Sequence, residues 1–321
     1  MTLEQLFKTS LVRIALLPLG WVVAAASAFF PSVPRHIVKK MRELFSPRLN
    51  DLLYEKLFLY NQSLRCFVTV PRFISTNTPI PIDLTLEMKD YVQAHFYFHG
   101  MPSFFLHLLA FCDSRTAFFD VGANMGLISV GISRFIPDEN IFAFEALPST
   151  YEHTCRVFKD NCPEASAFLQ ALSDKDGELV FHIPETDSGS ASASESPEEI
   201  KSGRSKALHI QTQRVPCKTF DAVYAGLTTS GKLLGLGRHA FKIDVEGHEV
   251  EVLQGMSGYF DGFHGEIILI VEVRQKCADQ VHNILEDKGF SALSPEVSAD
   301  GMKTRMRDCI YTRPFTESPE S

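Results

Sequence analysis

Three residues of types that handle protons lie close together in the run KIDVEGHE, at Asp244, Glu246 and His248. The ordinary pKa of histidine lies near neutrality, so His248 is the first candidate for accepting a proton, and Asp244 for orienting the substrate, the base or a ligand amino group. Simpler explanations stay open: Asp244 as a helix cap, Glu246 as an ion-pair partner of Lys242, and His248 as a solvated residue of a first helical turn. The three side chains alternate along an extended backbone, which points neighbours to opposite faces, so we expect no metal site.

A second group of residues forms a turn between two glycines in the run AFFDVGANMG. Asp120 marks the end of a buried strand, and Gly122 and Gly126 bracket Asn124 in a tight bend that precedes a helix starting near Leu127. The pattern D-x-G-x-x-x-G lacks the middle glycine of the dinucleotide fingerprint G-x-G-x-x-G. It therefore disfavours NAD and suits a small zwitterion such as the methionine end of S-adenosylmethionine. An ordinary capped turn between strand and helix is the alternative.

Two further stretches predict contacts to a nucleoside. The apolar run IFAF ends in Glu145, and a carboxylate at a strand end is what a ribose diol requires as acceptor. A third strand is expected over Phe168–Leu172, followed by a serine and an aspartate. Backbone groups near Ala171 and the carboxylate of Asp174 would there read the edge of an adenine. The predicted cofactor site thus combines the glycine turn, Glu145, Ala171 and Asp174.

Four segments, DVGANMG, FEALP, ALSDKDG and KIDVEGHEVEVLQG, resemble those of the FkbM family of S-adenosylmethionine-dependent methyltransferases in order and approximate spacing. The resemblance covers about residues 116–273. It implies S-adenosyl-L-methionine as cofactor and methylation of a hydroxyl group on a sugar, a glycolipid or a related small molecule, because the family methylates hydroxyls on glycans and polyketide products. It also implies an α/β, Rossmann-like class I methyltransferase fold, with a mostly parallel sheet flanked by helices. The helical patterns before residue 112 predict an N-terminal helical extension.

The spacing of apolar runs indicates the same α/β architecture. Strand ends recur at steps that fit a strand, a crossover helix and a parallel strand, except for one longer step that holds an insertion over residues 175–238. The candidate strand ends are Asp120, Glu145, Ala171, Asp244 and Glu272. Within the insertion we expect two paired strands, over residues 178–183 and 208–215. The polar segment over residues 188–206 is interpreted either as an idle surface loop or as a lid facing the substrate.

The chain is expected to have four parts: a hydrophobic segment over residues 1–34, a helical cap on the substrate side over 35–112, the methyltransferase domain over 113–313, and a disordered tail over 314–321. Within the cap, residues 36–65 predict an amphipathic helix, residues 66–82 a short strand and loop, and residues 84–111 an aromatic helix. His95 and His99 share one face of that aromatic helix, where a structural or pocket role is favoured over metal binding.

The N-terminal segment is uncharged from Ile14 to Pro34, and a basic cluster follows it directly. The cluster consists of Arg35, Lys39, Lys40 and Arg42. A signal peptide, a membrane anchor or interfacial helix, and a helix packed on a soluble core all fit this pattern. We favour membrane attachment with the catalytic part on the cytoplasmic side, because basic flanks stay in the cytoplasm. If the segment packs on the domain instead, the protein is expected to be cytoplasmic.

The net charge and the cysteine content of the chain disfavour some classes of function. The formal net charge is -8, and no dense lysine and arginine stretch accompanies the aromatic residues, which disfavours nucleic acid as a partner. The seven cysteines form no C-x-x-C pair and are odd in number, which indicates reduced thiols in the cytosol. Beside the leading enzyme hypothesis stands a membrane-associated, non-catalytic adaptor that keeps the methyltransferase fold. An NAD-dependent oxidoreductase is disfavoured by the glycine pattern.

Overall fold

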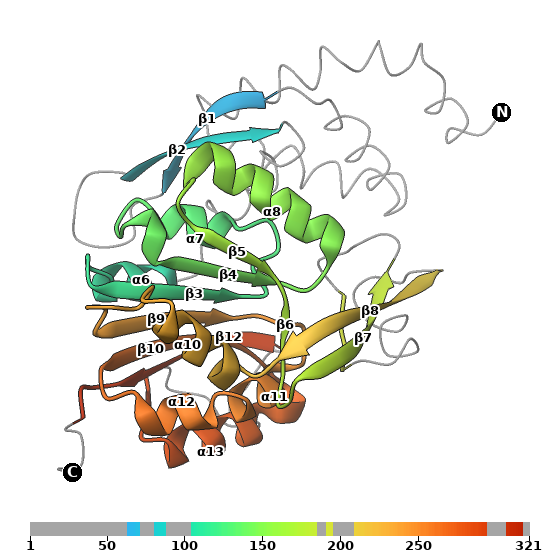
Figure 1. The fold of residues 1–321 in the computed structure, drawn as a ribbon, viewed down its shortest axis with the longest axis vertical. Coiled ribbons are helices and arrows are strands. Elements are labelled where there is room, and N and C mark those ends of the chain that lie inside the picture. Colours follow the sequence, from blue (N-terminus) through green and yellow to red (C-terminus); the bar gives the residue numbers. More distant parts are fainter. Residues whose placement is uncertain are drawn as a thin grey trace, which may run out of the picture. The chain divides into compact units, whose positions relative to one another are not determined.

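The computed structural model describes residues 63–70, 80–87, 104–184, 191–194, 209–293 and 306–316. The chain divides into two compact units, Met1–Met101 and Pro102–Ser321. In the first unit the described residues form an antiparallel hairpin of β1 (Ser63–Val70) and β2 (Ile80–Glu87) (Figure 1). The membrane-attachment segment, the cap helix up to residue 62, and His95 and His99 lie outside the described residues.

The hairpin corrects two expectations for the first unit. The aromatic helix predicted from residue 84 is wrong for its first four residues, which belong to β2, and the amphipathic helix predicted to residue 65 is wrong for its last three, which belong to β1. The sequence IPIDLTLE explains the strand, because apolar and polar residues alternate with the period of two that a half-buried strand requires. The register aligns Val70 with Ile80 and Ser63 with Glu87.

A seven-stranded sheet in the order β11-β12-β10-β9-β3-β4-β5 forms the centre of the second unit (Figure 1). Its strands are β3 (Thr116–Val121), β4 (Ile141–Glu145), β5 (Ser166–Leu169), β9 (Arg238–Ile243), β10 (Glu266–Arg274), β11 (Ser291–Ala292) and β12 (Met306–Arg313). Strands β5, β4, β3, β9 and β10 pair in parallel, and β12 pairs antiparallel to β10 and β11. The expected Rossmann-like, mostly parallel sheet is confirmed. Because β4 and β5 lie on one side of β3 and β9 on the other, the topological switch point lies between β3 and β9.

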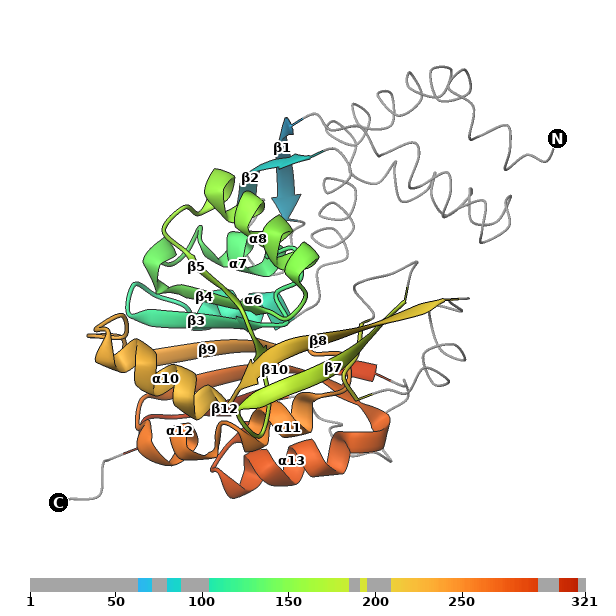
Figure 2. The same ribbon diagram turned by 45° about the vertical axis from the view of Figure 1, so that its right-hand side comes forward.

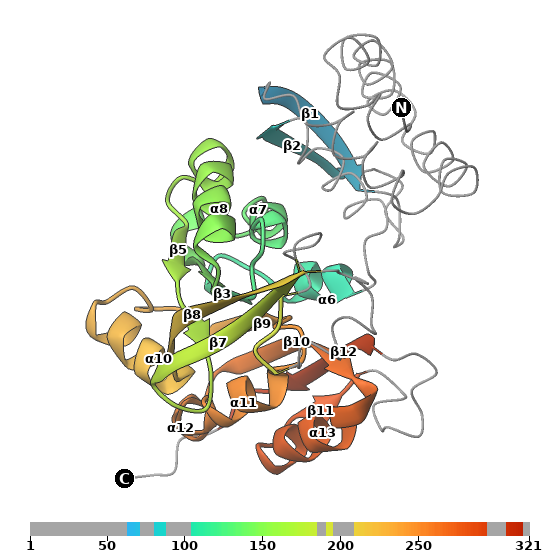
Figure 3. The same cartoon turned by 90° about the vertical axis from the view of Figure 1, so that its right-hand side faces the viewer.

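Helices cover both faces of this sheet. Figure 3 shows α10 (Phe220–Thr229), α11 (Glu249–Gln254), α12 (Ser257–Gly262) and α13 (Ala278–Asp287) on one side, and α6 (Phe104–Phe111) and α7 (Leu127–Ile132) on the other. The remaining helical elements are α8 (Pro148–Asn161), η1 (Asp138–Asn140) and η3 (Gln275–Cys277). Helix α7 begins where the glycine turn predicted a helix start. Helix α6 lies in the second unit although the sequence grouped it with the cap.

Aromatic side chains fill the core between the central strands and α10. Phe119 stacks on Phe142 and on Phe241, with ring centroids 5.3 and 4.6 Å away, and meets the ring of Phe220 edge-on at 5.2 Å. All four side chains are fully buried. Since strand residues alternate between faces, Asp120, the next residue in β3, points to the side of α7. The core thus fixes β3 and β9 beside each other and leaves the polar residues at their carboxyl ends for a site.

The insertion forms a separate three-stranded sheet in the order β6-β8-β7, with β6 (Ala171–Leu172), β7 (Gly177–Pro184) and β8 (Ile210–Lys218). The predicted strand pair is confirmed, and Figure 2 shows β7 and β8 side by side. The third strand predicted over Phe168–Leu172 is divided in the structure, because β5 ends at Leu169 and the next strand joins the sheet of the insertion.

Three smaller features bear on the remaining predictions. The tail predicted as disordered from residue 314 is anchored at its start, where the Thr316 amide donates a hydrogen bond of 2.9 Å to the His264 carbonyl oxygen. The six cysteines whose side chains are described are free. In the described parts of the chain, every helix is too short or too polar to cross a membrane.

Candidate active site

The glycine turn after β3 has a backbone that few residue types tolerate. Gly122, Asn124 and Gly126 have φ angles of 79°, 51° and 72°. A Cβ atom on Gly122 would lie 1.9 Å from the carbonyl oxygen of Asp244, and one on Gly126 would lie 2.5 Å from the ring of Phe158. Glycine is therefore required at Gly122 by a neighbouring backbone carbonyl and at Gly126 by neighbouring side chains, as well as by φ at both. The turn lies directly against the end of β9, at the switch point of the sheet.

Glu145, at the end of β4, holds this turn in place. Its carboxylate accepts hydrogen bonds of 2.9 Å from the amides of Asn124 and Leu147. The side chain is 8% exposed, and burial raises its pKa to about 7, although the two amides oppose the shift. Each carboxylate oxygen has a second lone pair, so Glu145 still has acceptor capacity for two hydroxyl groups.

Asp120 lies beneath the turn and is 1% exposed. The Ser129 hydroxyl of α7 donates a hydrogen bond of 2.7 Å to Oδ2, whereas Oδ1 is buried and has no partner among the described residues. Burial raises the pKa of Asp120, and the charge of Lys242 on the adjacent strand opposes that shift. A buried acceptor without a partner at the switch point is consistent with a ligand group or a water molecule bonding there.

The residues predicted to read an adenine lie in the segment that joins the two sheets. Ala171 is buried and pairs with Cys217 in β8, and Asp174 is exposed and accepts a hydrogen bond of 2.9 Å from the Ser173 hydroxyl. The Gln170 amide donates a hydrogen bond of 3.0 Å to the Glu145 carbonyl oxygen, which connects this segment to the end of β4. The adenine contact itself stays a prediction.

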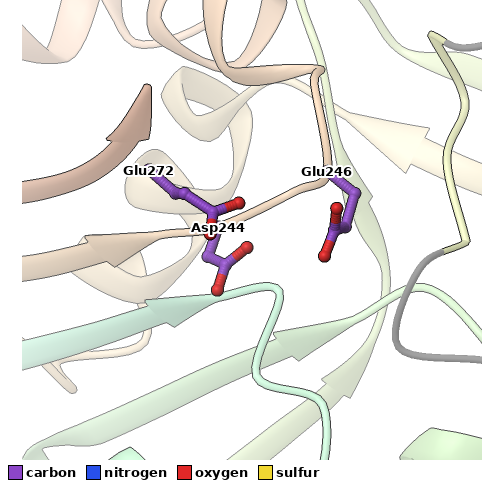
Figure 4. A group of neighbouring side chains, drawn as sticks. All are labelled: Asp244, Glu246 and Glu272. Carbon is purple, nitrogen blue, oxygen red and sulfur yellow. The ribbon is translucent and has the colours of Figure 1, made fainter. Parts of the chain in front are cut away.

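The carboxylates of Asp244, Glu246 and Glu272 each have an oxygen within 4.8 Å of the others. Figure 4 shows the three side chains near the ends of β9 and β10. The expectation that alternation would separate Asp244 from Glu246 is wrong, because residues two apart point to the same face of an extended backbone. The strand ends at Ile243, and φ angles of 53° at Glu246 and 102° at Gly247 turn the backbone back on itself. Glu272 reaches the group from β10.

Two of these three carboxylates face a cation of the protein. The Lys242 ammonium, only 4% exposed, lies 2.9 Å from Asp244 Oδ2, and the Arg274 guanidinium lies 2.8 Å from Glu246 Oε2. The ion pair between Glu246 and Lys242, one of the alternatives from the sequence, is therefore wrong. Lys242 pairs with Asp244, and Glu246 pairs with Arg274. Because a divalent ion would compete with both cations for the same oxygens, we assign no metal ligands here.

Glu272 is the third carboxylate, and its surroundings are strongly acidic. Its Oε2 atom is buried and has no hydrogen-bond partner among the described residues. Burial, followed by the charges of Asp244, Glu246 and Asp308, raises the pKa of Glu272 to about 9, while Lys242 opposes the shift. Burial likewise raises the pKa of Asp308, its neighbour across the sheet, to about 6.

His248 lies at the start of α11 and is buried rather than solvated, with 8% exposure. Its Nε2 atom lies 2.9 Å from the Ser173 hydroxyl and its Nδ1 atom 2.7 Å from the Ser194 hydroxyl, so serines engage both ring nitrogens. Burial lowers its pKa, and the nearby charge of Glu251 opposes that shift. The role of proton acceptor stays a prediction for His248.

Residues 191–194 of the insertion contact the turn that carries Glu246 and His248. The Ser192 hydroxyl donates a hydrogen bond of 2.7 Å to the Glu246 carbonyl oxygen, and Ser194 bonds to His248 as described. Ser192 also forms a β-bridge to His182 of β7. This described part of the predicted loop or lid therefore lies against the predicted catalytic turn.

The structure brings most of the predicted site residues to one edge of the sheet. Asp120, Gly122, Asn124, Gly126, Glu145, Asp244 and Glu246 gather where β3, β4 and β9 end. Sequence reasoning noted Glu272 only as a strand end and missed Asp308 and Glu249. The apolar run before Glu272 was a signal that could have identified Glu272. Asp308 is brought to the site by the antiparallel pairing of β12 with β10, which no local sequence pattern indicates.

Glu249 shapes the turn itself. It is fully buried, and its Oε1 atom accepts hydrogen bonds of 3.3 and 3.0 Å from the amides of Val245 and Gly247. Burial raises its pKa to about 7. By bonding to both amides, the Glu249 carboxyl group holds the turn in the conformation that brings the carboxylates of Asp244 and Glu246 together.

Comparison with known proteins finds similarity to methyltransferases over the part of the chain that contains this site. The family model for the methyltransferase FkbM domain matches residues 120–292. Methyltransferase sdnD of Sordaria araneosa is 28% identical over 237 residues, which are 67% of this chain and 90% of that protein.

Two solved structures are also similar. The methyltransferase FkbM from Methylobacillus flagellatus KT gives a TM-score of 0.36 at 10% identity, over 70% of this chain and 54% of that one. The protein TYW2 of M. jannaschii, solved in complex with AdoMet, gives a TM-score of 0.34 at 10% identity. The alignment covers 79% of this chain and 86% of that one. The family match spans more than half of the chain and includes the glycine turn, Glu145 and the run around Asp244. The chain therefore belongs to the FkbM family of S-adenosylmethionine-dependent methyltransferases.

Proposed function

We propose that this methyltransferase acts on a hydroxyl group of a sugar, a glycolipid or a related small molecule. The observation that carries the proposal is the group of carboxylates at the carboxyl ends of β9 and β10, formed by Asp244, Glu246 and Glu272. The ionised carboxylates of Asp244 and Glu246 accept hydrogen bonds from O–H groups and donate none, so this group favours an acceptor that brings hydroxyls. The group lies next to the glycine turn, so an acceptor bound there would lie beside the proposed cofactor site.

The residues at the switch point fit S-adenosylmethionine. Glu145 has acceptor capacity for a ribose diol, Gly122 leaves no room for a side chain between the turn and Asp244, and Asp120 presents a buried acceptor without a partner. When bound, S-adenosylmethionine supplies a methyl group on a positively charged sulfur. The protein's part is then to hold the acceptor oxygen in line with that methyl group and to take up a proton.

The ion pairs around the carboxylates suit an acceptor with several hydroxyl groups. The pairs Lys242–Asp244 and Glu246–Arg274 place hydrogen-bond donors next to acceptors, and a sugar hydroxyl is both donor and acceptor. Neighbouring hydroxyls of one sugar ring can therefore bond to both members of a pair. A non-catalytic adaptor would need none of this arrangement.

Labelled methyl transfer tests the proposal. Purified protein is incubated with methyl-labelled S-adenosylmethionine and with lipid and glycan extracts from cells that lack the gene. We expect label in a methyl ether on a sugar or glycolipid, identified by mass spectrometry and present in unlabelled form in cells that carry the gene. Label found only on nitrogen or carbon of the products would overturn the hydroxyl assignment.

We also propose that residues 1–34 attach the enzyme to the cytoplasmic side of a membrane, which would bring it to a lipid-linked acceptor. The support is in the sequence: an uncharged stretch from Ile14 to Pro34 followed by four basic residues up to Arg42. Burying apolar side chains in the bilayer stabilises attachment, and each basic residue near an anionic surface adds about 1 kcal/mol.

A further inference from the structure

We propose that Glu272 is the catalytic residue that accepts the proton of the hydroxyl group being methylated. This inference rests on the proposed function, because it assumes a hydroxyl acceptor. It assigns the proton transfer to a carboxylate on β10 in place of His248.

The position of Glu272 is the first argument. The parallel pairing of β9 and β10 ends at Val271, so Glu272 is the first residue of β10 beyond that pairing and lies beside Asp244, at the edge of the sheet where ligands of this fold bind. Figure 4 shows the carboxylates of Glu272 and Asp244 close together and that of Glu246 across from them. A hydroxyl held by Asp244 or Glu246 is therefore within reach of Glu272.

The partners of the neighbouring groups are the second argument. Asp244 is held by Lys242, and Glu246 by Arg274 and by its own turn, so both have fixed positions and stabilised negative charges. The Oε2 atom of Glu272 lacks such a partner among the described residues. Its capacity to accept a hydrogen bond, and then a proton, is thus available for a substrate hydroxyl.

The charges that face Glu272 come from every strand beside it. Lys242 and Asp244 belong to β9 and its end, Glu246 to the following turn, and Asp308 to β12. Arg274 follows on β10 itself and is paired with Glu246, and the buried Asp120 of β3 interacts with Lys242 and Asp244. Acidic groups outnumber basic ones, so the free enzyme keeps a proton on Glu272 near neutral pH.

Binding of the cationic cofactor changes this state. An added positive charge near Glu272 favours its ionised form, which is the form that can accept a proton. In the reaction the acceptor oxygen gives its proton to Glu272 and bonds to the methyl carbon, while the bond between methyl carbon and sulfur breaks and its electron pair stays on the sulfur. Product release restores the free enzyme, with the proton left on Glu272.

Proton release on binding gives a test that does not depend on turnover. Calorimetric titration at about pH 8, in buffers of different ionisation enthalpy, counts the protons released when S-adenosylmethionine binds. We expect the wild type to release most of one proton with S-adenosylmethionine and much less with S-adenosylhomocysteine, which lacks the sulfonium charge. Glu272→Gln should bind S-adenosylmethionine within a few-fold of the wild type but release almost none. Glu266→Gln, on the same strand at its other end, is the matched control and should behave as the wild type.

Turnover supplies the second readout. Glu272→Gln should lower kcat by about 100-fold or more, with KM for the acceptor changed far less, and Glu272→Asp should restore part of the rate. Equal proton release with both ligands, or unchanged release in Glu272→Gln, would overturn the inference. So would loss of the release in His248→Gln alone, or a loss of turnover on chelation that Mg²⁺ restores. Failure to bind S-adenosylmethionine at all would instead reject the proposed function.

Discussion

Glu145 combines two tasks in one side chain. It fixes the glycine turn through the amides of Asn124 and Leu147, and in the proposed cofactor site its remaining lone pairs would accept from a ribose. A residue with both tasks affects the empty protein as well as the complex, so a substitution has to be measured on both.

We predict that Glu145→Gln weakens the binding of S-adenosylmethionine by about 10- to 100-fold, the scale of losing charge-assisted hydrogen bonds. Calorimetry measures the affinity, and thermal unfolding of the empty protein reports any change in the turn. Glu152→Gln, at an exposed position on α8, is the control and should leave the affinity unchanged. An affinity within two-fold of wild type in Glu145→Gln would show that the ribose is bound elsewhere.

The sequence predicted the local backbone of the glycine turn better than the surroundings of His248. Gly122, Gly126 and Glu145 are constrained by local geometry, a tight turn and a strand end, which a short pattern reveals. His248 was selected for its ordinary pKa, but burial and two serine hydroxyls determine its environment, and both serines come from distant segments. Glu272 becomes conspicuous only when three strands bring Asp244, Asp308 and Lys242 around it.

At the level of elements, the turn after β3 is fixed by its contact with the end of β9. The Asp244 amide donates a hydrogen bond of 3.0 Å to the Val121 carbonyl oxygen, and the Asp244 carbonyl group fills the space beside Gly122. The two turns that form the site are thus one packed unit.

We predict that Gly122→Ala destabilises the protein by about 2 kcal/mol or more, because the new methyl group meets a backbone carbonyl at a φ of 79°. Gly226→Ala is the matched control. Gly226 lies in α10 with open space around its Cβ position, so alanine should stabilise the helix by about 1 kcal/mol or less. Urea unfolding of both variants tests the pair, and equal effects would contradict the close approach of the two turns.

Strands β3, β4 and β10 were predictable because each contains an apolar run that is followed by a carboxylate, at Asp120, Glu145 and Glu272. The hairpin of the first unit was partly misread, since aromatic residues further along favoured a helix over the alternation in IPIDLTLE. The division of the third strand between two sheets follows from pairing with β8, which lies far along the chain and leaves no mark on residues 168–172.

For the whole molecule, buried acids dominate the dependence of stability on pH. Burial raises the pKa of Glu145 and Glu249 to about 7 and that of Glu272 to about 9, all above the ordinary value of 4.5. Between about pH 6.5 and 9 the folded chain therefore binds more protons than the unfolded chain, whereas below this range the buried His239, whose pKa burial lowers to about 3, opposes the three acids. The free energy of unfolding must fall as pH rises through this window, by at most about 1.4 kcal/mol per pH unit for each group.

Urea unfolding of the ligand-free protein at several pH values in this window measures that slope. We predict a decline with rising pH, and a shallower decline in Glu272→Gln, above all between about pH 7 and 9, where Glu272 alone of the three keeps its proton. Stability that rises over this range, or an unchanged slope in the variant, would contradict the protonated state assigned to Glu272.

Cell fractionation tests the proposed attachment of the whole molecule to a membrane. We predict that the full chain appears uncleaved in the membrane pellet and that a form starting at Arg35 stays folded in the supernatant. Mature protein that starts near Phe29 would indicate a signal peptide. An insoluble short form would indicate that the segment packs on the folded protein.

The glycine turn and Glu145 are expected to form a site for S-adenosylmethionine at the switch point of the sheet. Calorimetric titration of the full chain with S-adenosylmethionine and, separately, with NAD measures whether this site exists. We predict saturable binding of S-adenosylmethionine and no heat from NAD, because the turn lacks the middle glycine that a pyrophosphate needs. Saturable binding of NAD with no response to S-adenosylmethionine would contradict this expectation.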